Sequence, residues 1–490
     1  MTNTGLKVKK TRKNKLAKLA LGSAVLGSSL VSLEAAKLSD VINDMTISGI
    51  AFTRVQTVHG RDAEGTRWQL RFKPTLTTGD FKGWSATVGI YFSKGSSIAD
   101  SNTAASDLGG ISAATIHSSA DRFNISDFYI TYKAKEQLGT NTVIHAGTKS
   151  PATPLNDTTA ARAIGVFIEN SDLSFMTVGF QWWDTWMDSD IYYSGTGLTT
   201  NGIAADNNMF LIYFNSPKSF TEKYNVAYRA YYGYINRWVD AMVFADGSYK
   251  LNLGDKGAFG SLLVTAQLGM TLITDNPHIM TADPNSGLDK WYSTMGKGNY
   301  AKFRGAYNVR VDYNKSFAVG SSSGEEGDKG DSISVNAFAG FAGSFGDGFG
   351  VILNHPGGFN LGGHLWDSYS GTNANGFGIL GAGGFKNSSI MLGYVGTKVK
   401  YKDADFGLDV AYVTATHFWY PKKAGTSGNL NSWTSVVYGS GNAIKQGNML
   451  DLSINVGYKL TKNIKAMAFY AYGFGKVSLG RFRLQVNYVF

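Results

Sequence analysis

One seven-residue stretch carries charged side chains that could act directly on a solute. RWQLRFK, residues 67–73, alternates polar and bulky apolar residues, so an extended strand would present one polar face made of Arg67, Gln69, Arg71 and Lys73. Side chains on one face of a strand are spaced about 6–7 Å apart. The stretch therefore predicts a ladder of mainly cationic groups, which attracts anions and orders water but cannot be packed in hydrocarbon.

A second stretch repeats this pattern with more charge. Residues 302–313, KFRGAYNVRVDY, place aromatic and apolar side chains on one face, and the other face is predicted to carry Lys302, Arg304, Arg310 and Asp312. Carboxylates on other predicted strands, at Asp127, Asp409 and Asp451, offset part of the positive charge. The sequence thus predicts water-facing charges of both signs, and it fixes no ion preference.

Two shorter motifs invite other chemistry, and each has a plainer interpretation. Gly376, Gly378 and Gly381 match the dinucleotide-binding pattern GxGxxG, but no strand precedes them and no helix follows, which favours a flexible outer loop. The acidic run EEGDKGD at 325–331 has oxygen ligands for calcium, yet its spacing is not that of an EF-hand loop and favours a solvated turn.

Histidines and tryptophans supply no stronger site. His355 and His364 flank PGGFNLGG without an evident third metal ligand. The run WWDTW at 182–186 either stacks sugars or lies at a membrane rim, and the rim is favoured. Seven histidines show no pairing with Ser or Asp, and the chain has no cysteine to act as a nucleophile. We therefore predict no catalytic residue, no metal and no cofactor, and a protein that is not an enzyme.

A long series of strands must position these side chains. The 490 residues include 60 glycines and 13% aromatic residues, and charged residues make up 17%, below the ~25% typical of soluble domains. Alternating apolar and polar residues recur from Met45 onward in segments of about ten residues, the strand length that crosses a tilted bilayer path. We count eighteen strands; sixteen are an alternative, because 205–215 is apolar on both faces and 240–254 is irregular.

The connections between the predicted strands alternate in length. Short turns are predicted near 77–83, 134–140, 170–174, 216–222, 254–259, 402–405 and 460–463, with a longer one at 319–331. Outer connections are predicted near 56–66, 94–123, 150–164, 184–206, 235–246, 272–298, 342–388, 418–447 and 475–480. This alternation, together with bulky aromatics near the ends of the apolar faces, favours an all-β transmembrane antiparallel β-barrel over a soluble sandwich.

The chain ends on the alternating strand RFRLQVNYVF. Free C-termini are usually frayed and polar, but here an apolar row that includes Phe482, Tyr488 and Phe490 reaches the last residue. A lipid-facing last strand that pairs with the first would explain the row, because an open edge in hydrocarbon leaves backbone groups unpaired. The terminal Phe also resembles the recognition signal of outer-membrane barrel assembly, so lipid and the assembly machinery are expected partners.

The N-terminus has the layout of a secretory signal peptide. Seven Lys and Arg residues precede the first acid, Glu34, and the apolar run LALGSAVLGSSLVSL follows the last of them. We predict cleavage within 32–36, which removes 1–36 and leaves 37–490 as the barrel. The loss leaves 39 basic and 35 acidic residues, so the net charge falls from +10 to +4. A basic arm for nucleic acid or a membrane surface is the alternative, and no nucleic-acid partner is expected.

Residues 145–184, HAGTKSPATPLNDTTAARAIGVFIENSDLSFMTVGFQWWD, resemble the major outer-membrane porins of Campylobacter and Helicobacter relatives. The matching residues are Gly147, Lys149, Thr153, Pro154, Asp157, Gly165 and Val166. The resemblance implies an eighteen-stranded, trimeric general diffusion porin for ions and small hydrophilic solutes. It also implies that the 150–164 loop folds inward as the constriction, with Asp157 and Arg162 facing the basic ladder. The glycine-rich segment 338–384 has no counterpart in this resemblance.

Two other functions stay open at this point. A barrel hydrolase, such as an outer-membrane phospholipase or protease, needs Ser/His or Asp/His pairs at the barrel mouth, and none is visible in the sequence. A surface adhesin would use the long outer connections 342–388 and 418–447 to bind host or partner molecules, and its pore would be incidental. Electrical conductance separates a diffusion porin from both.

Overall fold

The structure is a computed structural model that describes most of the chain after residue 40. The described residues are 41–60, 65–99, 122–156, 161–188, 191–194, 196–199, 202–205, 207–275, 277, 300–319, 331–353, 358–366, 377–379, 382–418, 444–475 and 478–490. In these ranges, no helix is long and apolar enough to cross a membrane. Short helical elements include α3 (Lys135–Leu138), α4 (Lys218–Tyr224), η2 (Asp255–Gly257) and η4 (Ala382–Gly384).

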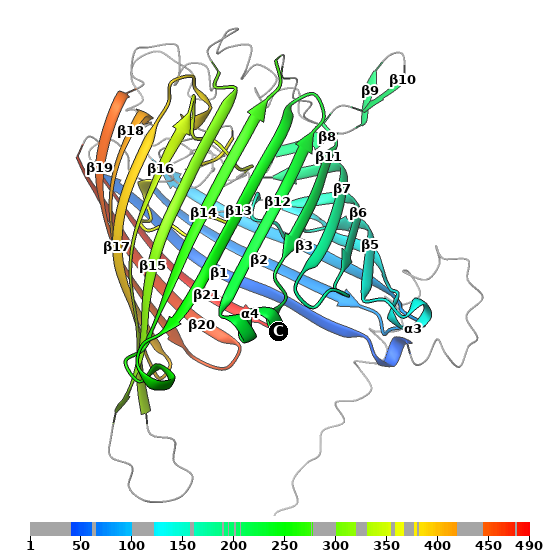
Figure 1. Cartoon of the computed structure of the whole chain (residues 1–490), viewed down its shortest axis with the longest axis horizontal. Coiled ribbons are helices and arrows are strands. Elements are labelled where there is room, and N and C mark those ends of the chain that lie inside the picture. Colours follow the sequence, from blue (N-terminus) through cyan, green and yellow to red (C-terminus); the bar gives the residue numbers. More distant parts are fainter. Residues whose placement is uncertain are drawn as a thin grey trace, which may run out of the picture.

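Eighteen long strands form one antiparallel ring (Figure 1). In ring order they are β1 (Thr46–Gly60), β2 (Gly65–Thr77), β3 (Trp84–Ala99), β4 (Arg122–Lys133), β5 (Thr142–Lys149), β6 (Arg162–Asn170), β7 (Thr177–Asp188), β11 (Met209–Asn215), β12 (Val226–Ile235), β13 (Val239–Asn252), β14 (Ser261–Ile273), β15 (Phe303–Val319), β16 (Asp331–Gly346), β17 (Ile390–Tyr401), β18 (Ala404–Phe418), β19 (Ile444–Lys459), β20 (Ile464–Gly475) and β21 (Leu479–Val489). The short β8 (Ile191–Ser194) pairs with the end of β7, while β9 (Thr196–Thr199) and β10 (Gly202–Ala205) pair with each other.

The ring closes between the first and last strands. β1 pairs with β21 along eleven residues, from Ile50 opposite Val489 to Gly60 opposite Leu479. On the far side, β7 pairs directly with β11, so the β8–β10 excursion leaves the ring continuous. Closure removes the open edges of the ring itself, as hydrocarbon requires of a sheet. The prediction of eighteen strands with a closing C-terminal strand is confirmed.

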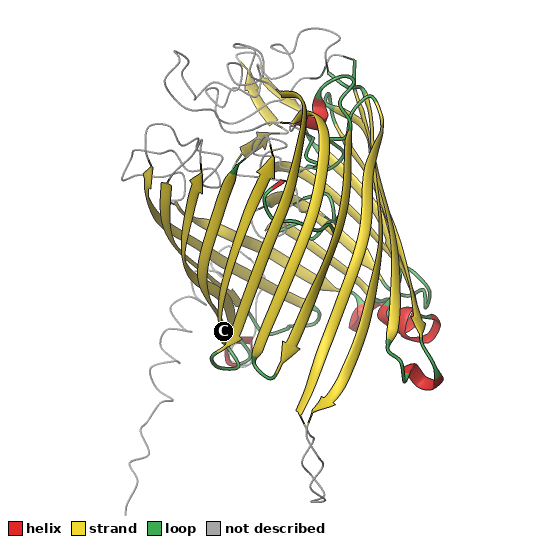
Figure 2. Cartoon of the chain, turned by 90° about the vertical axis from the view of Figure 1, so that its left-hand side faces the viewer, coloured by secondary structure: helices red, strands yellow, loops and turns green. Residues whose placement is uncertain are grey.

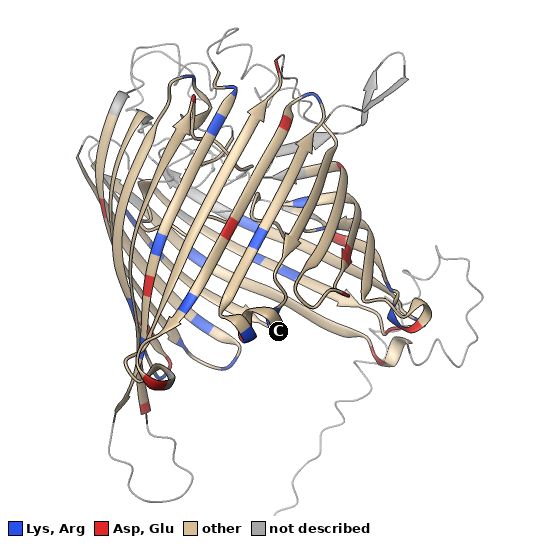
Figure 3. Cartoon of the chain, viewed as in Figure 1, with Lys and Arg blue, Asp and Glu red and all other residues tan. Residues whose placement is uncertain are grey.

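The alternating residues separate into an outer and an inner face as the sequence predicts. On β2, Trp68 and Phe72 are exposed to the outside, whereas Gln69 between them is buried in the interior. The same division holds on β15, where Val309 and Val311 are exposed and Asn308 and Arg310 are buried. Figure 3 shows the consequence: charged residues appear as isolated bands on strands that are otherwise uncharged.

The short turns lie on the side of the barrel that holds both ends of the described chain. All eight predicted turns fall between strands of the structure, for example between β17 and β18 at 402–403 and between β19 and β20 at 460–463. The hairpin of β15 and β16 extends furthest on this side (Figure 2), because Val319 still pairs with Asp331 where β14 and β17 have ended.

Candidate functional site

The described parts of the connection between β16 and β17 fold into the barrel. We call residues 347–353, 358–366, 377–379 and 382–389 the inner plug. Its hydrogen bonds to inward-facing residues of β14, β15, β18 and β19 place it against the wall. This corrects the expectation that 342–388 is an outer loop. The glycine-rich segment has no strand or helix periodicity, so its position could not be derived from a repeat.

An apolar core forms between the inner plug and the wall. Val351, Ile352, Phe359 and Phe377 of the plug are almost fully buried, and Phe359 packs edge-on against Phe244 of β13 at 5.3 Å between ring centroids. Backbone bonds tie the plug together, including Val351 N–H to the Phe377 carbonyl at 2.7 Å. The described residues of the plug are therefore packed as densely as a protein core and do not form a loop that lies loosely in water.

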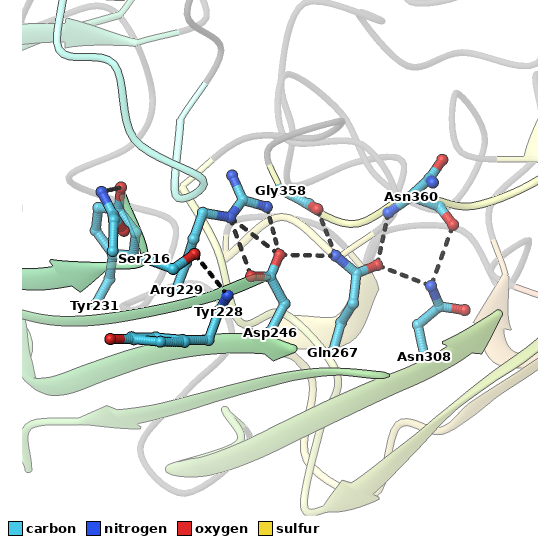
Figure 4. A network of polar contacts seen from close by, with 10 residues as sticks. Ser216, Tyr228, Arg229, Tyr231, Asp246, Gln267, Asn308, Gly358 and Asn360 are labelled. Carbon is cyan, nitrogen blue, oxygen red and sulfur yellow. Dashed lines mark hydrogen bonds and ion pairs between the residues drawn. The ribbon is translucent and has the colours of Figure 1, made fainter. Parts of the chain in front are cut away.

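A chain of polar contacts fixes the middle of the plug to β14 and β15 (Figure 4). The Gln267 amide of β14 donates to the Gly358 carbonyl at 2.7 Å, and its oxygen accepts from the Asn360 N–H at 2.8 Å. Asn308 of β15 donates to Gln267 Oε1 at 2.8 Å and to the Asn360 carbonyl at 3.1 Å. Arg229 of β12 and Asp246 of β13 extend the chain along the wall through a bidentate pair.

The β5–β6 connection also lies inside and contacts the plug. Leu155 is fully buried, its carbonyl accepts the Leu353 N–H at 2.7 Å, and the Pro154 carbonyl accepts the Gly358 N–H at 2.7 Å. Two connections therefore meet within the barrel, where the resemblance implied one. Asp157, the predicted acid of the constriction, lies outside the described residues.

Cationic side chains gather on another arc of the wall, which we call the basic wall: Arg54, Arg71, Lys73, Lys149, Arg162, Arg481 and Arg483, on β1, β2, β5, β6 and β21. Several lie over aromatic rings. The Arg71 guanidinium is 4.9 Å from the Phe52 ring and 5.1 Å from the Tyr91 ring, and Lys149 is 5.5 Å from Tyr129. A ring face attracts the cation without neutralising it, so the positive field persists in the channel.

One carboxylate interrupts the basic wall. Asp127 lies 3.6 Å from the Lys73 ammonium, and a bulge places it there. Opposite Gly89 and Ile90 of β3, the register skips one residue of β4, so both Ser126 and Asp127 point inward while Ile125 and Phe128 stay outside. The bulge thus places one carboxylate beside a lysine of the basic wall.

The predicted site residues on β15 have different surroundings. Arg304 is fully buried beneath the plug and donates to the Ile379 carbonyl, while Arg310 and Asp312 form a buried pair at 2.8 Å. Lys302 precedes β15 and pairs with Asp275, half exposed. These residues were grouped with the ladder because they alternate with apolar ones, but the plug covers this part of the wall. Arg71 and Lys73 belong to the basic wall on β2, and the Arg67 side chain is outside the description.

The other motifs find structural positions. Trp183 and Trp186 are buried inside the barrel, with Trp186 stacked on Trp238 at 6.4 Å, so the predicted membrane rim is wrong for both. His364 contacts Asp409 and carries part of the plug, while His355 lies outside the described residues. In the described ranges, no group of three or more His, Cys, Asp or Glu is arranged to hold a metal ion.

The fold can be compared with solved structures. OccK8 (OprE) of Pseudomonas aeruginosa superposes with a TM-score of 0.52 at 14% identity, over 91% of this chain and 98% of that one. OprD of the same organism gives 0.51 at 12% identity, covering 91% and 95%, and OpdL gives 0.53 at 11%, covering 91% and 99%. These neighbours are outer-membrane porins. The chain has their fold. No protein-family model and no curated protein sequence matches it.

Sequence reasoning missed the residues that hold the plug. Asp409 and Asp451 were identified only as water-facing carboxylates, and Gln267 and Asn308 were not singled out, because the partners of all four lie in a segment without periodicity. One signal was available: strand 205–215 is apolar on both faces. Met209 and Leu211 of β11 pack inward into the apolar core while Phe210 and Ile212 face outward, so an apolar inner face marks where the barrel is filled.

Proposed function

We propose that this chain is an outer-membrane diffusion porin that passes ions and small hydrophilic solutes through a water-filled channel. The observation that carries the proposal is the contrast between two arcs of one closed wall. The plug packs against β13–β19, whereas the basic wall on β21, β1, β2, β5 and β6 carries half-buried cations that hydrocarbon could not hold. The fold shared with outer-membrane porins supports the same function.

We infer that the pore favours anionic solutes. Seven cations gather on this one arc, and Arg54, Arg71 and Arg483 lie over ring faces, while Asp127 pairs with Lys73. Arg71 and Lys73 line the passage in this proposal, with Arg162 at its edge. Asp157 supplies the opposing acid on the inward-folded 150–164 connection, which would set a transverse field across the constriction.

Location and processing follow from the same proposal. Residues 1–36 direct export and are cleaved, and residues 37–490 insert in the outer membrane with Phe490 as the assembly signal. The resemblance of 145–184 to the major porins of Campylobacter and Helicobacter relatives supports this placement and a homotrimer. The adhesin alternative required two outer loops for binding, 342–388 and 418–447. The described parts of the first that follow β16 lie inside the barrel, so they are not available as an outer binding surface.

Liposome swelling tests the diffusion function and its charge preference together. Proteoliposomes are diluted into isosmotic glucose, gluconate or glucosamine, which have similar size and differ in charge. We expect all three to enter, with gluconate faster than glucosamine in dilute salt. Swelling no faster than in protein-free liposomes would reject the porin function, and equal rates for the two ions would reject the anion preference alone.

A further inference from the structure

The inner plug is fastened to the wall at two places of different character. Around 351–359 it is held by the apolar core, which includes Phe359 against Phe244. Around 364–366 the side chains of Leu365 and Trp366 also pack in this core, but polar contacts to β18 and β19 are added. The two attachments respond differently to water, because an apolar contact has no substitute in water whereas a hydrogen bond does.

A single carboxylate oxygen makes most of the second attachment. Asp451 Oδ2 accepts the backbone N–H groups of His364 at 2.8 Å, Leu365 at 2.6 Å and Trp366 at 3.2 Å. Asp451 is fully buried on the inner face of β19. Three consecutive N–H groups that converge on one point form a concavity for an anion, and the wall supplies that anion as a side chain.

Side chains around His364 complete this attachment. The His364 Nε2 atom lies 3.1 Å from Asp409 Oδ2 on β18 and 3.3 Å from the Asn455 amide on β19. The imidazole stacks on Phe469 of β20, with 5.4 Å between the ring centroids. The contacts of residues 364–366 thus spread over three strands, and Asp451 is the group that meets all three backbone positions.

We propose that Asp451 is the positioning residue of the inner plug: its carboxylate holds residues 364–366 against the wall and thereby fixes the cross-section of the channel. Without that charge, water in the lumen replaces the acceptor of the three N–H groups. The segment is then held more weakly, mainly through the packing of Leu365 and Trp366, and it leaves the wall part of the time, while the apolar core keeps the rest of the plug in place. The inference rests on the proposed diffusion function, because a cross-section matters only to a channel.

Single-channel recording in planar bilayers tests the proposal. We expect the natural protein to show one steady conductance level. Asp451→Asn, which is nearly isosteric but uncharged, should fluctuate between that level and a larger one. Asp451→Glu, which keeps a carboxylate, should restore the steady level. The matched control is Asp405→Asn on β18, whose carboxylate pairs with Lys465 at half-exposed positions near the short turns; it should record like the natural protein.

A labelling measurement decides the question independently of conductance. The chain has no cysteine, so Leu365→Cys introduces a single thiol at a fully buried position of the attachment. In assembled barrels, a charged methanethiosulfonate should modify Leu365→Cys slowly. Adding Asp451→Asn should raise the rate by about tenfold or more, the factor expected when charge-assisted hydrogen bonds become neutral ones. Adding Asp405→Asn should leave it unchanged.

The outcomes separate the two proposals. Steady natural conductance in Asp451→Asn together with unchanged labelling overturns the role of Asp451 and leaves the porin function intact. A natural protein that does not conduct overturns the porin function, and the labelling rates still decide whether Asp451 positions the plug. If Asp451→Asn fails to assemble, Leu365→Cys is compared with Leu365→Cys/Asp451→Glu, where equal slow rates support the role and accelerated labelling contradicts it.

Discussion

Phe490, the last residue of the chain, forms a reciprocal pair of backbone hydrogen bonds with Gly49 of β1. The Gly49 N–H donates to the Phe490 carbonyl at 2.9 Å, and the Phe490 N–H donates to the Gly49 carbonyl at 3.1 Å. A Cβ atom on Gly49 would lie 2.7 Å from the Phe490 ring and 2.4 Å from the Lys73 carbonyl oxygen, which explains the glycine. The terminal residue is therefore part of the ring closure and is not a frayed end.

Phe490→Asp should impair barrel assembly much more than synthesis. The Phe490 ring stacks on Phe72 at 5.8 Å and on Tyr488 at 5.4 Å between centroids, and each aromatic pair contributes about 0.5–1.5 kcal/mol. The folded barrel should lose roughly 1–3 kcal/mol, while the level at the cell surface falls more steeply if Phe490 is also the assembly signal. Surface labelling and heat-modifiable migration measure both. Normal values for Phe490→Asp would refute its role in closure.

The mature protein should begin between Leu33 and Lys37. Export through a signal peptide requires removal of the basic, acid-free segment and its apolar run. Mass spectrometry of purified outer membranes reads the N-terminal peptide directly. Detection of an intact Met1 in the membrane-inserted protein would contradict the proposed signal peptide.

Arg71→Glu should move the reversal potential toward cations. A change of two unit charges about 5 Å from a passing ion changes its energy by about 1.7 kcal/mol at the dielectric constant of water, so its permeability should change by up to about twentyfold before screening. The measurement requires dilute salt, since screening acts over ~8–10 Å at 0.1–0.15 M. Lys218→Glu on the exposed α4 makes the same change of charge outside the ring and should have little effect. Equal reversal potentials for Arg71→Glu and the natural protein would show that Arg71 does not line the ion path.

Asp172 should stabilise two turns in a pH-dependent manner. It accepts hydrogen bonds from the Thr140 hydroxyl at 2.6 Å, the Asn141 backbone N–H at 2.7 Å and the Asn170 amide at 2.7 Å. These bonds lower the pKa of Asp172 from its usual 3.8 to about 2, with the Thr140 bond contributing most. Because the folded pKa lies below the unfolded one, the stabilisation is complete above about pH 4 and is lost as the pH falls toward 2.

The unfolding temperature of Asp172→Asn in detergent checks this linkage. The variant should unfold at a lower temperature than the natural protein at pH 7, and the difference should disappear by about pH 2. Asp255→Asn, in the turn between β13 and β14, is the matched control. A difference between Asp172→Asn and the natural protein that is constant from pH 7 to pH 2 would show that the carboxylate charge does not matter.

The strand pattern of this fold follows from local sequence, and its interior does not. Alternation specifies each strand because a shift of one residue would move a row such as Trp68 and Phe72 from lipid into the lumen. The short turns follow from gaps between these rows. The segment 240–254, described above as irregular, begins at a register shift between Val239 and Ala241. The strand propensities of single residues do not reveal such a shift.

The plug could not be predicted because its stability comes from contacts distant in sequence. Asp451 and His364 are 87 residues apart, and Gln267 and Gly358 are separated by 91. Glycine-rich chain carries no period that would indicate such pairs. The charged residues of β2 were identified correctly as inward-facing at Arg71 and Lys73, whereas the similar pattern on β15 gave no warning that Arg304 is covered.

Single-channel conductance of the purified full-length mature protein in a planar bilayer, with a salt gradient for the reversal potential, tests the central claim most directly. We expect stepwise insertion of steady, water-filled channels. In dilute salt, the sign of their reversal potential should show that anions permeate more readily than cations. A folded, heat-modifiable barrel that inserts in the bilayer without raising its conductance above that of bare lipid would contradict the central claim.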